Sequence, residues 1–449
     1  MKVNNKSFTT FIFKLQKISK PVNAIHICSY IQEINKITYY KYYNSILNNT
    51  NFFLLNLPEK NCSFIALGNI FNYNKKFSRT NKLHIQHIHN FKKNKFNFYP
   101  LFVGGIKFPI KEKSNLWNDF PTEIWYVPEI SFITYKNRYF FAFNFMFDDV
   151  INTETLNKKL KTIFRPQKNI TESLNEVFLK STTFNQWEKM VSTAFKKIES
   201  GELYKVVLAR LKKRPLKTNI NLKELIEKLK KENSECYVFC WKNNDSIFLG
   251  ASPELLGKFS NNKFETDALA GSIRRGTNHN EDDLLANQLL NDKKNINEHN
   301  SVVNYLIHKL SEYSTSVTYD KTKIRKLKNI QHLWTPIKAK VRKNISIIEL
   351  IKNIFPTPAI CGLPKVKALK TIEQLENFDR GLYAGVMGWF NLNGNGEFFV
   401  SIRSALIKNS SLYLFAGSGI VEESEIKNEF EETELKFKTL MSIFKLNQI

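Results

Sequence analysis

The sequence predicts an α+β protein with large antiparallel β-sheets. Apolar residues recur at helical spacing in three stretches, 187–200, 222–231 and 296–310, which predicts amphipathic helices. Short alternating runs joined by turns at 236–249 and 402–415 predict hairpin strands. Long helices mixed with hairpins, without a regular strand–helix alternation, are typical of α+β folds.

The first part of the chain contains Phe- and Tyr-rich runs separated by Asn and Lys loops, which predict short strands. Residues 98–108 include Gly104 and Gly105 and predict a pair of strands. Residues 139–147 predict a further strand, since Asn144 interrupts the apolar run. A junction is predicted near 166–182, dividing the chain into residues 1–170 and 180–445. After it, residues 204–210 predict a strand.

Composition indicates a folded protein of two or three domains. The 449 residues are 42% hydrophobic and 13% aromatic, enough for a large core. The net charge of +26 would suggest nucleic acid, but Lys is spread along the chain and accompanies excess Asn, Ile and Phe. We interpret this as A+T-rich codon usage. No nucleic-acid partner is predicted, although the charge would attract small anions.

Cysteine usage and hydropathy predict a cytoplasmic protein. Five cysteines are an odd number, and Cys236 and Cys240 alternate as core thiols on a strand. The N-terminus lacks the pattern of a secretory signal. No apolar run reaches about 18 residues, so no membrane span is expected.

A glycine-containing run followed by an acidic segment is the strongest candidate site. Residues 416–421 predict a turn around Gly417 and Gly419, whose N–H groups could bind an anion. Glu429 and Glu432, three apart on a predicted helix, share a face and could bind a hard cation, with Lys436 nearby. The alternative is an ordinary helix N-terminus, where Glu is favoured.

Two further residues are candidates for acid–base chemistry. Lys205 shares a strand face with apolar Val207 and Ala209, and burial of an ammonium group favours its neutral, basic form. Glu254 follows Ser-Pro and precedes two leucines; an apolar setting favours a protonated carboxyl group that acts as an acid. The alternatives are a lysine that reaches water at a rim and a solvated turn glutamate.

Several other polar residues lie in apolar or glycine-containing contexts. Gly271 and Ser272 permit close backbone approach to a ligand, and the tandem Arg274–Arg275 either binds carboxylate or forms a basic surface loop. Glu298 lies on an apolar helix stripe and needs a partner, for which a metal is one option.

Two more stretches contribute candidates. His332 is either a core histidine or part of a site, and prolines around Thr357 predict a rigid extended loop. Arg403 either binds carboxylate bidentately or lies on a strand rim.

Taken together, these runs resemble the chorismate-utilising enzymes: isochorismate synthase, salicylate synthase, and the large subunits of anthranilate and aminodeoxychorismate synthases. The resemblance covers about residues 180–445, in order and spacing. It implies two large antiparallel β-sheets packed as a sandwich with helices outside. Residues 1–170 would be a divergent part that completes the same fold.

Within the family, the chain most resembles isochorismate synthase, since Lys205 and the loops at 268–272 and 356–359 match water-using members. The resemblance implies that Lys205 activates water and Glu254 protonates the departing hydroxyl of chorismate. It implies Mg²⁺ bound by Glu298, Glu432 and Glu429. The implied substrate-binding residues are Gly271, Ser272, His332, Arg403, Gly417, Gly419 and Lys436.

Two positions depart from the family pattern: Phe355, where His is common, and Asn295, where Asp is common.

Salicylate synthase, which also eliminates pyruvate, is the nearest alternative. Ammonia-using synthases, which usually need a glutaminase partner, are disfavoured by Lys205, so no such partner is expected. A basic nucleic-acid-binding protein and an inactive homologue are further alternatives. The sequence does not separate menaquinone from siderophore synthesis; a housekeeping cytosolic role favours menaquinone.

Overall fold

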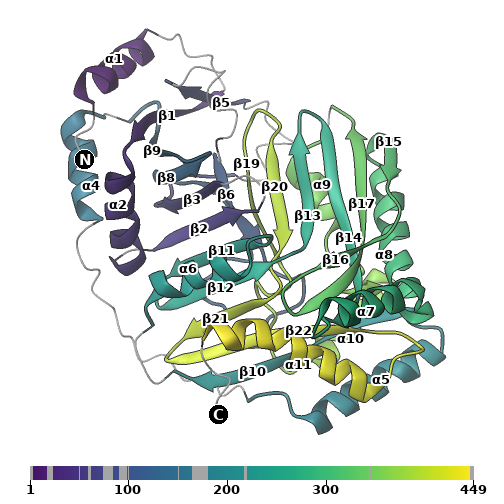
Figure 1. The fold of residues 1–449 in the computed structure, drawn as a ribbon. Helices are drawn as coiled ribbons and strands as arrows, with labels where there is room; N and C mark the ends of the chain where they lie inside the picture. Colours follow the sequence, from purple (N-terminus) through teal and green to yellow (C-terminus); the bar gives the residue numbers. More distant parts are fainter. Residues whose placement is uncertain are drawn as a thin grey trace.

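A computed structural model describes residues 4–17, 24–49, 51–58, 62–73, 84–90, 99, 101–149, 151–163, 180–216, 220–343 and 345–444. These residues form two large β-sheets with helices around them (Figure 1). Across these ranges, no helix is long and apolar enough to span a membrane.

The larger sheet has 12 strands in the described chain and mixes segments from both ends of the sequence. All its pairs are antiparallel except β1 with β5, which run parallel. In spatial order its strands are β18 (Gly362–Leu363), β10 (Lys205–Pro215), β22 (Ser411–Ile420), β21 (Ser404–Lys408), β12 (Ser246–Ser252), β11 (Tyr237–Asn243), β2 (Phe52–Leu57), β3 (Cys62–Leu67), β8 (Ile130–Tyr135), β9 (Arg138–Met146), β1 (Ala24–Ile34) and β5 (His84–His89).

The second sheet has 10 described strands and is antiparallel throughout. In order they are β15 (Ser314–Tyr319), β17 (Ile330–Val341), β14 (Lys263–Arg274), β13 (Leu255–Ser260), β20 (Gly396–Val400), β19 (Val386–Phe390), β6 (Phe102–Ile106), β7 (Glu123–Val127) and β4 (Phe71–Asn72); β16 (Lys323–Lys326) pairs with β17. Tyr237 of the first sheet stacks on Phe399 of the second, with ring centroids 5.0 Å apart. Aromatic contacts of this kind join the inner faces into one core.

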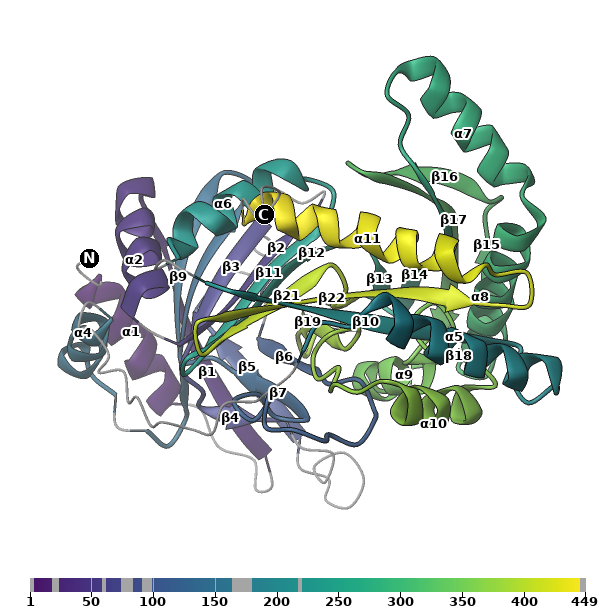
Figure 2. The ribbon, with the colours of Figure 1, turned by 90° about the horizontal axis from the view of Figure 1, so that it is seen from below.

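Helices cover the outer faces of the two sheets (Figures 1 and 2). Their apolar stripes, for example Leu225, Ile226 and Leu229 of α6, are buried while their charged residues face outward. The helices are α1 (Asn5–Gln16), α2 (Lys36–Asn49), α4 (Thr153–Thr162), α5 (Phe184–Glu199), α6 (Leu222–Glu232), α7 (His279–Asn291), α8 (Lys293–Ser311), α9 (Ile347–Ile354), α10 (Lys365–Leu375) and α11 (Ile426–Ile443). The sandwich with outer helices is therefore confirmed.

Most predicted elements of the second part are present within a few residues: α5, α6, α8, β10 and the hairpins β11–β12 and β21–β22. The strand predicted from residue 402 begins instead at Ser404, because Arg403 has a left-handed φ of 51° that is incompatible with a strand. The strand pair predicted at 98–108 is wrong: Gly104 and Gly105 lie inside the single strand β6. Residues 98 and 100 lie outside the described ranges, as does most of the predicted junction near 166–182. The division at 170–180 stays a prediction.

A buried ion pair joins three segments that surround the interior of the sandwich. Arg380 and Glu376 are each 1% exposed, with Nη2 2.5 Å from Oε1. Glu376 also accepts a hydrogen bond from the backbone N–H of Ala209, and Arg380 donates to the carbonyl oxygens of Val207 and Ile360. Strand β10 and the 355–362 loop are thereby tied to the segment after α10, and each buried charge is compensated by its partner.

Replacement of Glu376 by Gln would leave the Arg380 guanidinium buried without a counter-charge. We expect Glu376→Gln to lower the free energy of unfolding by about 3–5 kcal/mol, measured by chemical denaturation. The matched control is Arg138→Gln, which breaks the pair between Arg138 and Glu33; both side chains are more than 40% exposed, so stability should change little. Equal losses in the two variants would contradict the proposed importance of the buried pair.

Candidate active site

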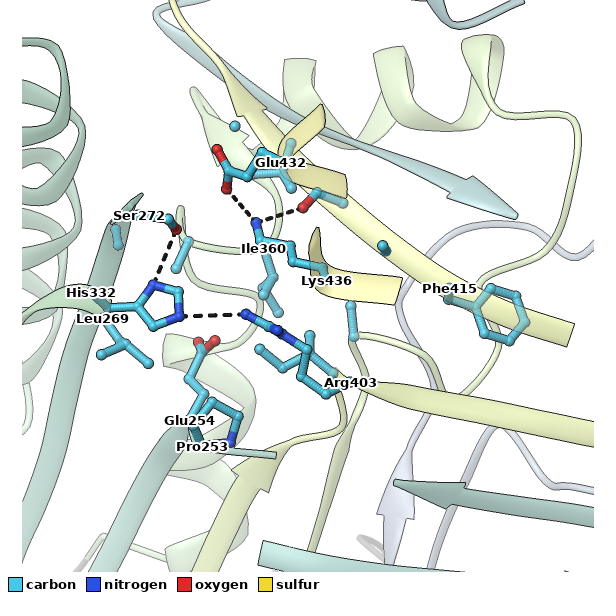
Figure 3. A pocket seen from close by; sticks show the side chains of 18 of the residues that line it. Pro253, Glu254, Leu269, Ser272, His332, Ile360, Arg403, Phe415, Glu432 and Lys436 are labelled. Atoms are coloured by element: carbon cyan, nitrogen blue, oxygen red, sulfur yellow. Dashed lines mark hydrogen bonds and ion pairs between the residues drawn. The ribbon is translucent and has the colours of Figure 1, made fainter. Parts of the chain in front are cut away.

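One cavity between the two sheets collects most of the predicted site residues. It encloses about 720 Å³ of empty space, part of it open to solvent. Ten of the twelve predicted residues line it: Glu254, Gly271, Ser272, Glu298, His332, Arg403, Gly417, Gly419, Glu432 and Lys436. Figure 3 shows Glu254, His332 and Arg403 directed toward the same space. Lys205 and Glu429 do not line the cavity. Lys205 contacts the lining residue Glu298, and Glu429 contacts Ser418, which lies between two lining glycines.

Lys205 lies at the start of β10 and is fully buried, with Nζ 2.9 Å from Oε1 of the cavity residue Glu298. The two groups are an ion pair by distance, but the angle between them does not satisfy a hydrogen bond; Nζ has no aligned partner among the described residues. Gly419 makes this contact possible, because a Cβ there would lie 2.6 Å from Glu298 Oε1. The amine is therefore positioned by a carboxylate and retains hydrogen-bonding capacity.

The glycine turn predicted at 416–421 is wrong, because Gly417 and Gly419 lie inside strand β22. Pairing with β10, where Gly419 faces Val207 and Gly417 faces Ala209, overrides the local turn tendency. Val207 and Ala209 direct their N–H groups away from β22, to Cys361 and Glu376. By the alternation of an antiparallel ladder, the N–H groups of Gly417 and Gly419 point away from β10. They remain available as anion donors on the open edge of β22.

Glu254 follows strand β12 and is 5% exposed. Its backbone N–H donates to Ser252 Oγ and its carbonyl accepts from Val400, which fixes the turn. Burial raises the pKa of the Glu254 carboxyl to about 8; the positive charge of Lys205 opposes this shift. Glu254 is therefore a protonated acid at neutral pH.

A bulge in β14 shapes the opposite wall. Gly271 has a φ of 74° and interrupts the pairing with β17, so that Ser272 faces His332. His332 is buried, and burial, with the nearby Arg403 charge, lowers its pKa to about 3, so the ring is neutral. The network assigns the tautomer: Nδ1–H donates to the Gly271 carbonyl at 3.1 Å, and Arg403 Nη2 lies 3.4 Å from Nε2. The unprotonated Nε2 of His332 thus faces the Arg403 guanidinium as a hydrogen-bond acceptor.

Helix α11 carries the acidic residues, and Arg210 of β10 holds it in place. The Arg210 guanidinium stacks 3.5 Å from the ring centre of Phe430 and donates to Thr433 Oγ1 and Glu434 Oε1 at 2.6 and 2.8 Å. Because Arg210 is 2% exposed, these contacts are shielded from water. The helix face toward the cavity is therefore fixed relative to β10.

Each of the three predicted metal ligands is paired with a lysine. Lys436 Nζ lies 2.6 Å from Glu432, and Lys294 of α8 pairs with Glu429, which also accepts from Ser418. Burial and the neighbouring Glu432 charge raise the pKa of Glu429. Burial alone would also raise the pKa of Glu432. The charge and hydrogen bond of Lys436 have the larger, opposite effect, so the pKa of Glu432 lies below its ordinary value. The cluster is a set of close carboxylates that requires nearby cations.

A family model described as "Chorismate binding enzyme" matches residues 12–445. The chain belongs to this family. The isochorismate synthase MenF of Bacillus subtilis is 32% identical over 94% of this chain and 94% of its own length. The salicylate biosynthesis isochorismate synthase of Pseudomonas aeruginosa is 40% identical over 57% of this chain and 54% of its own. The structure of Escherichia coli MenF, titled as the menaquinone-specific isochorismate synthase, covers 97% of this chain with a TM-score of 0.74; at 22% identity it supports the fold alone.

The two departures from the family pattern lie outside the cavity lining of this chorismate-binding enzyme. Asn295 accepts a hydrogen bond from the Ser272 N–H through Oδ1, a contact that an aspartate oxygen would also make. Phe355 packs edge-on against Phe108, and its carbonyl accepts from Lys365. Both residues therefore support neighbouring segments without facing the cavity.

Arg274 is exposed and Arg275 is half-buried, and neither lines this cavity. Arg274 pairs with Glu281 and Arg275 with Asp282 at the start of α7, so neither is placed to bind a carboxylate in this cavity. Sequence reasoning missed Lys294, whose partner lies 135 residues away, and the lining residues Arg380 and Tyr383.

The donor chemistry fits a hard cation. Glu298 and Glu432 face one cavity, Glu429 is adjacent, and carboxylate oxygens are preferred by Mg²⁺. Within the described ranges, no three His, Cys, Asp or Glu side chains converge closely enough to form a preformed metal cluster. Each of the three carboxyl groups is instead paired with a lysine. Glu429 and Glu432 repel each other, and a bound dication would relieve this repulsion.

Glu254 should make stability pH-dependent. Its carboxyl is protonated in the folded protein up to about pH 8 but ionises near its ordinary pKa of about 4.3 when unfolded. The stabilisation is therefore fully present below about pH 4 and is lost as pH rises through about 8. Glutamine at position 254 does not titrate, so Glu254→Gln should not share this loss of stability. We therefore expect the difference between the melting temperatures of Glu254→Gln and the parent (variant minus parent) to increase from pH 5 to pH 8 and then to level off. A difference that is constant with pH would contradict the buried, protonated state.

Proposed function

We propose that this chorismate-binding enzyme is an isochorismate synthase, which converts chorismate reversibly to isochorismate. The observation that carries the proposal is the buried Lys205 amine beside Glu298 at the cavity, together with similarity over nearly the whole chain to an isochorismate synthase. A base at this position serves a reaction in which water, not ammonia, is the nucleophile. The absence of an obligatory glutaminase partner and a cytoplasmic location belong to the same proposal.

In the proposed mechanism, Lys205 removes a proton from a water molecule whose oxygen bonds to C2 of the ring. The ring double bonds shift, the C4–O bond breaks, and the carboxyl proton of Glu254 passes to the departing hydroxyl, which leaves as water. One water is consumed and one released, so substrate and product are isomers. The proton gained by the free amine of Lys205 returns through solvent to Glu254, which restores the enzyme for the next turnover. The raised pKa of Glu254 supports its role as the acid, since the proton is present at neutral pH.

The remaining residues would bind and orient the substrate. Arg403, Lys436 and the N–H groups of Gly417 and Gly419 supply donors for carboxylates, and both side chains line the cavity. Gly271, Ser272 and His332 would contact the ring from the bulged strand. Glu298, Glu432 and Glu429 would hold Mg²⁺, which when bound neutralises and positions the ring carboxylate.

We further propose that the product serves quinone synthesis. The similarity to Bacillus subtilis MenF spans 94% of this chain, whereas the Pseudomonas relative named for salicylate biosynthesis matches 57%.

Incubation of the full chain with chorismate and Mg²⁺, without ammonia, should yield a product of unchanged mass, resolved by chromatography and mass spectrometry. We expect Lys205→Ala to lower kcat about 100-fold or more and EDTA to abolish turnover. Lys197→Ala, which removes an α5 lysine paired with Glu202, is the matched control and should retain activity. Salicylate with pyruvate as products would assign a salicylate synthase, and turnover only with ammonia would refute the role of Lys205.

The rate should also fall on the alkaline side. Because the proposed acid must be protonated and its pKa is about 8, kcat should decrease about tenfold per pH unit above that value. Glu254→Gln should lower kcat strongly and abolish this alkaline limb in the residual activity. A pH–rate profile with the same limb in the parent and in Glu254→Gln would show that another group is titrating.

A further inference from the structure

A second cavity adjoins the catalytic cavity. It encloses about 730 Å³ of empty space, part of it open to solvent, close to the 720 Å³ of the catalytic cavity. Pro253 and Arg403 line both. We call this second space the outer cavity.

Segments that are distant in sequence form the outer cavity. They include the turn after α6 at 232–236, the turn between β16 and β17 at 326–330, and α11 through Thr439; Ala251, Pro253, Arg275 and Arg403 complete the lining. The same helix presents Glu432 and Lys436 to the catalytic cavity. Since Pro253 immediately precedes Glu254, the outer cavity ends beside the residues proposed to react with and bind the substrate.

The charged side chains that line the outer cavity are mainly basic. The cations are Arg275, Lys326, Lys328 and Arg403, and the acids are Glu232 and Glu235. Lys328 pairs with Glu232, Arg275 pairs with Asp282, and Lys326 pairs with both Asp282 and Asp283, neither of which lines the cavity. These three cations are compensated, so the attraction of this cavity for a small anion rests on Arg403.

Arg403 differs from the other three cations. It is 7% exposed and forms no ion pair with a residue that the structure describes; its guanidinium contacts the neutral ring of His332. A buried guanidinium without a carboxylate is costly, and a ligand carboxylate would remove that cost. Because Arg403 borders both cavities, a carboxylate could meet it from the outer side. The other cations in the catalytic lining, Arg380 and Lys436, are each already paired with a glutamate, Glu376 and Glu432.

We propose that the outer cavity is the vestibule through which a small dianionic carboxylate reaches the catalytic cavity, and that Arg403 receives the carboxylate at the boundary. The identity of this ligand as chorismate rests on the proposed function. Apart from Arg403, the lining of such a vestibule controls the rate of exchange between solvent and site without contributing to the bound state.

Obstruction of the vestibule tests the proposal. Ser234 is exposed on the turn after α6, and Asn329 lies on the β16–β17 turn, so Ser234→Trp and Asn329→Trp place an indole on two different rims. Each is combined with Glu254→Gln, which slows turnover strongly so that binding precedes it, in the full chain with Mg²⁺. Chorismate association and dissociation are followed by rapid-mixing tryptophan fluorescence, with Kd measured independently by calorimetry. At least one Trp variant should lower both rate constants about fivefold or more and leave Kd within about twofold.

Two controls separate obstruction from other effects. Ser234→Ala changes the same residue without adding bulk, and Ser260→Trp adds an indole to the exposed end of β13 away from both cavities; neither should change the rate constants. Rate constants equal to the parent in both rim variants, or a changed Kd at constant association rate, would overturn the vestibule. If Glu254→Gln and the otherwise unchanged chain both fail to bind chorismate, the proposed function itself is wrong.

Discussion

The buried pair between Glu376 and Arg380 is the constraint on which the site geometry depends. Its hydrogen bonds reach the backbone of β10 at Val207 and Ala209 and the loop at Ile360, and Arg380 itself lines the catalytic cavity. An uncompensated charge at either position would be expensive, so the three segments are held in one arrangement. Lys205 begins the same strand that the pair fixes, and the opposite edge of that strand pairs with β22. The position of the proposed base is thereby determined by residues that do not touch it.

A second principle is charge compensation inside the sandwich. Three glutamates near the cavity are matched by three lysines, each supplied by a different element: β10, α8 and α11. This pairing gives each carboxyl group a lysine partner and holds it in place within a largely buried region. It also means that a bound dication and its substrate would enter a site that is already close to electrically neutral, so the lysines must be able to exchange a protein carboxylate for a ligand carboxylate. Lys436, which also donates to the Gly417 carbonyl, is well placed for such an exchange.

Helices and hairpins of the second part were predictable because their periodicity is local: α6 and β11–β12 follow directly from apolar spacing. Ten of twelve candidate residues line one cavity. They were predictable because the order and spacing of the motifs resemble the family, not because any single residue indicated a site. The failures involve long-range pairing. Gly417 and Gly419 have turn-like composition, yet the ladder with β10 makes them a strand; Arg274 and Arg275 carry charges whose partners on α7 no local pattern reveals. The left-handed backbone at Arg403 is likewise set by its surroundings and not by its residue type.

The close approach of Gly419 to Glu298 has a consequence for how this site can change over generations. A side chain at position 419 would bring its first carbon to 2.6 Å from the carboxylate oxygen that touches Lys205. Because that oxygen is the end of a flexible side chain, the substitution would be accommodated by a shift of Glu298 relative to Lys205. A change at position 419 would therefore act on the contact between Lys205 and Glu298 while leaving both residues in the sequence.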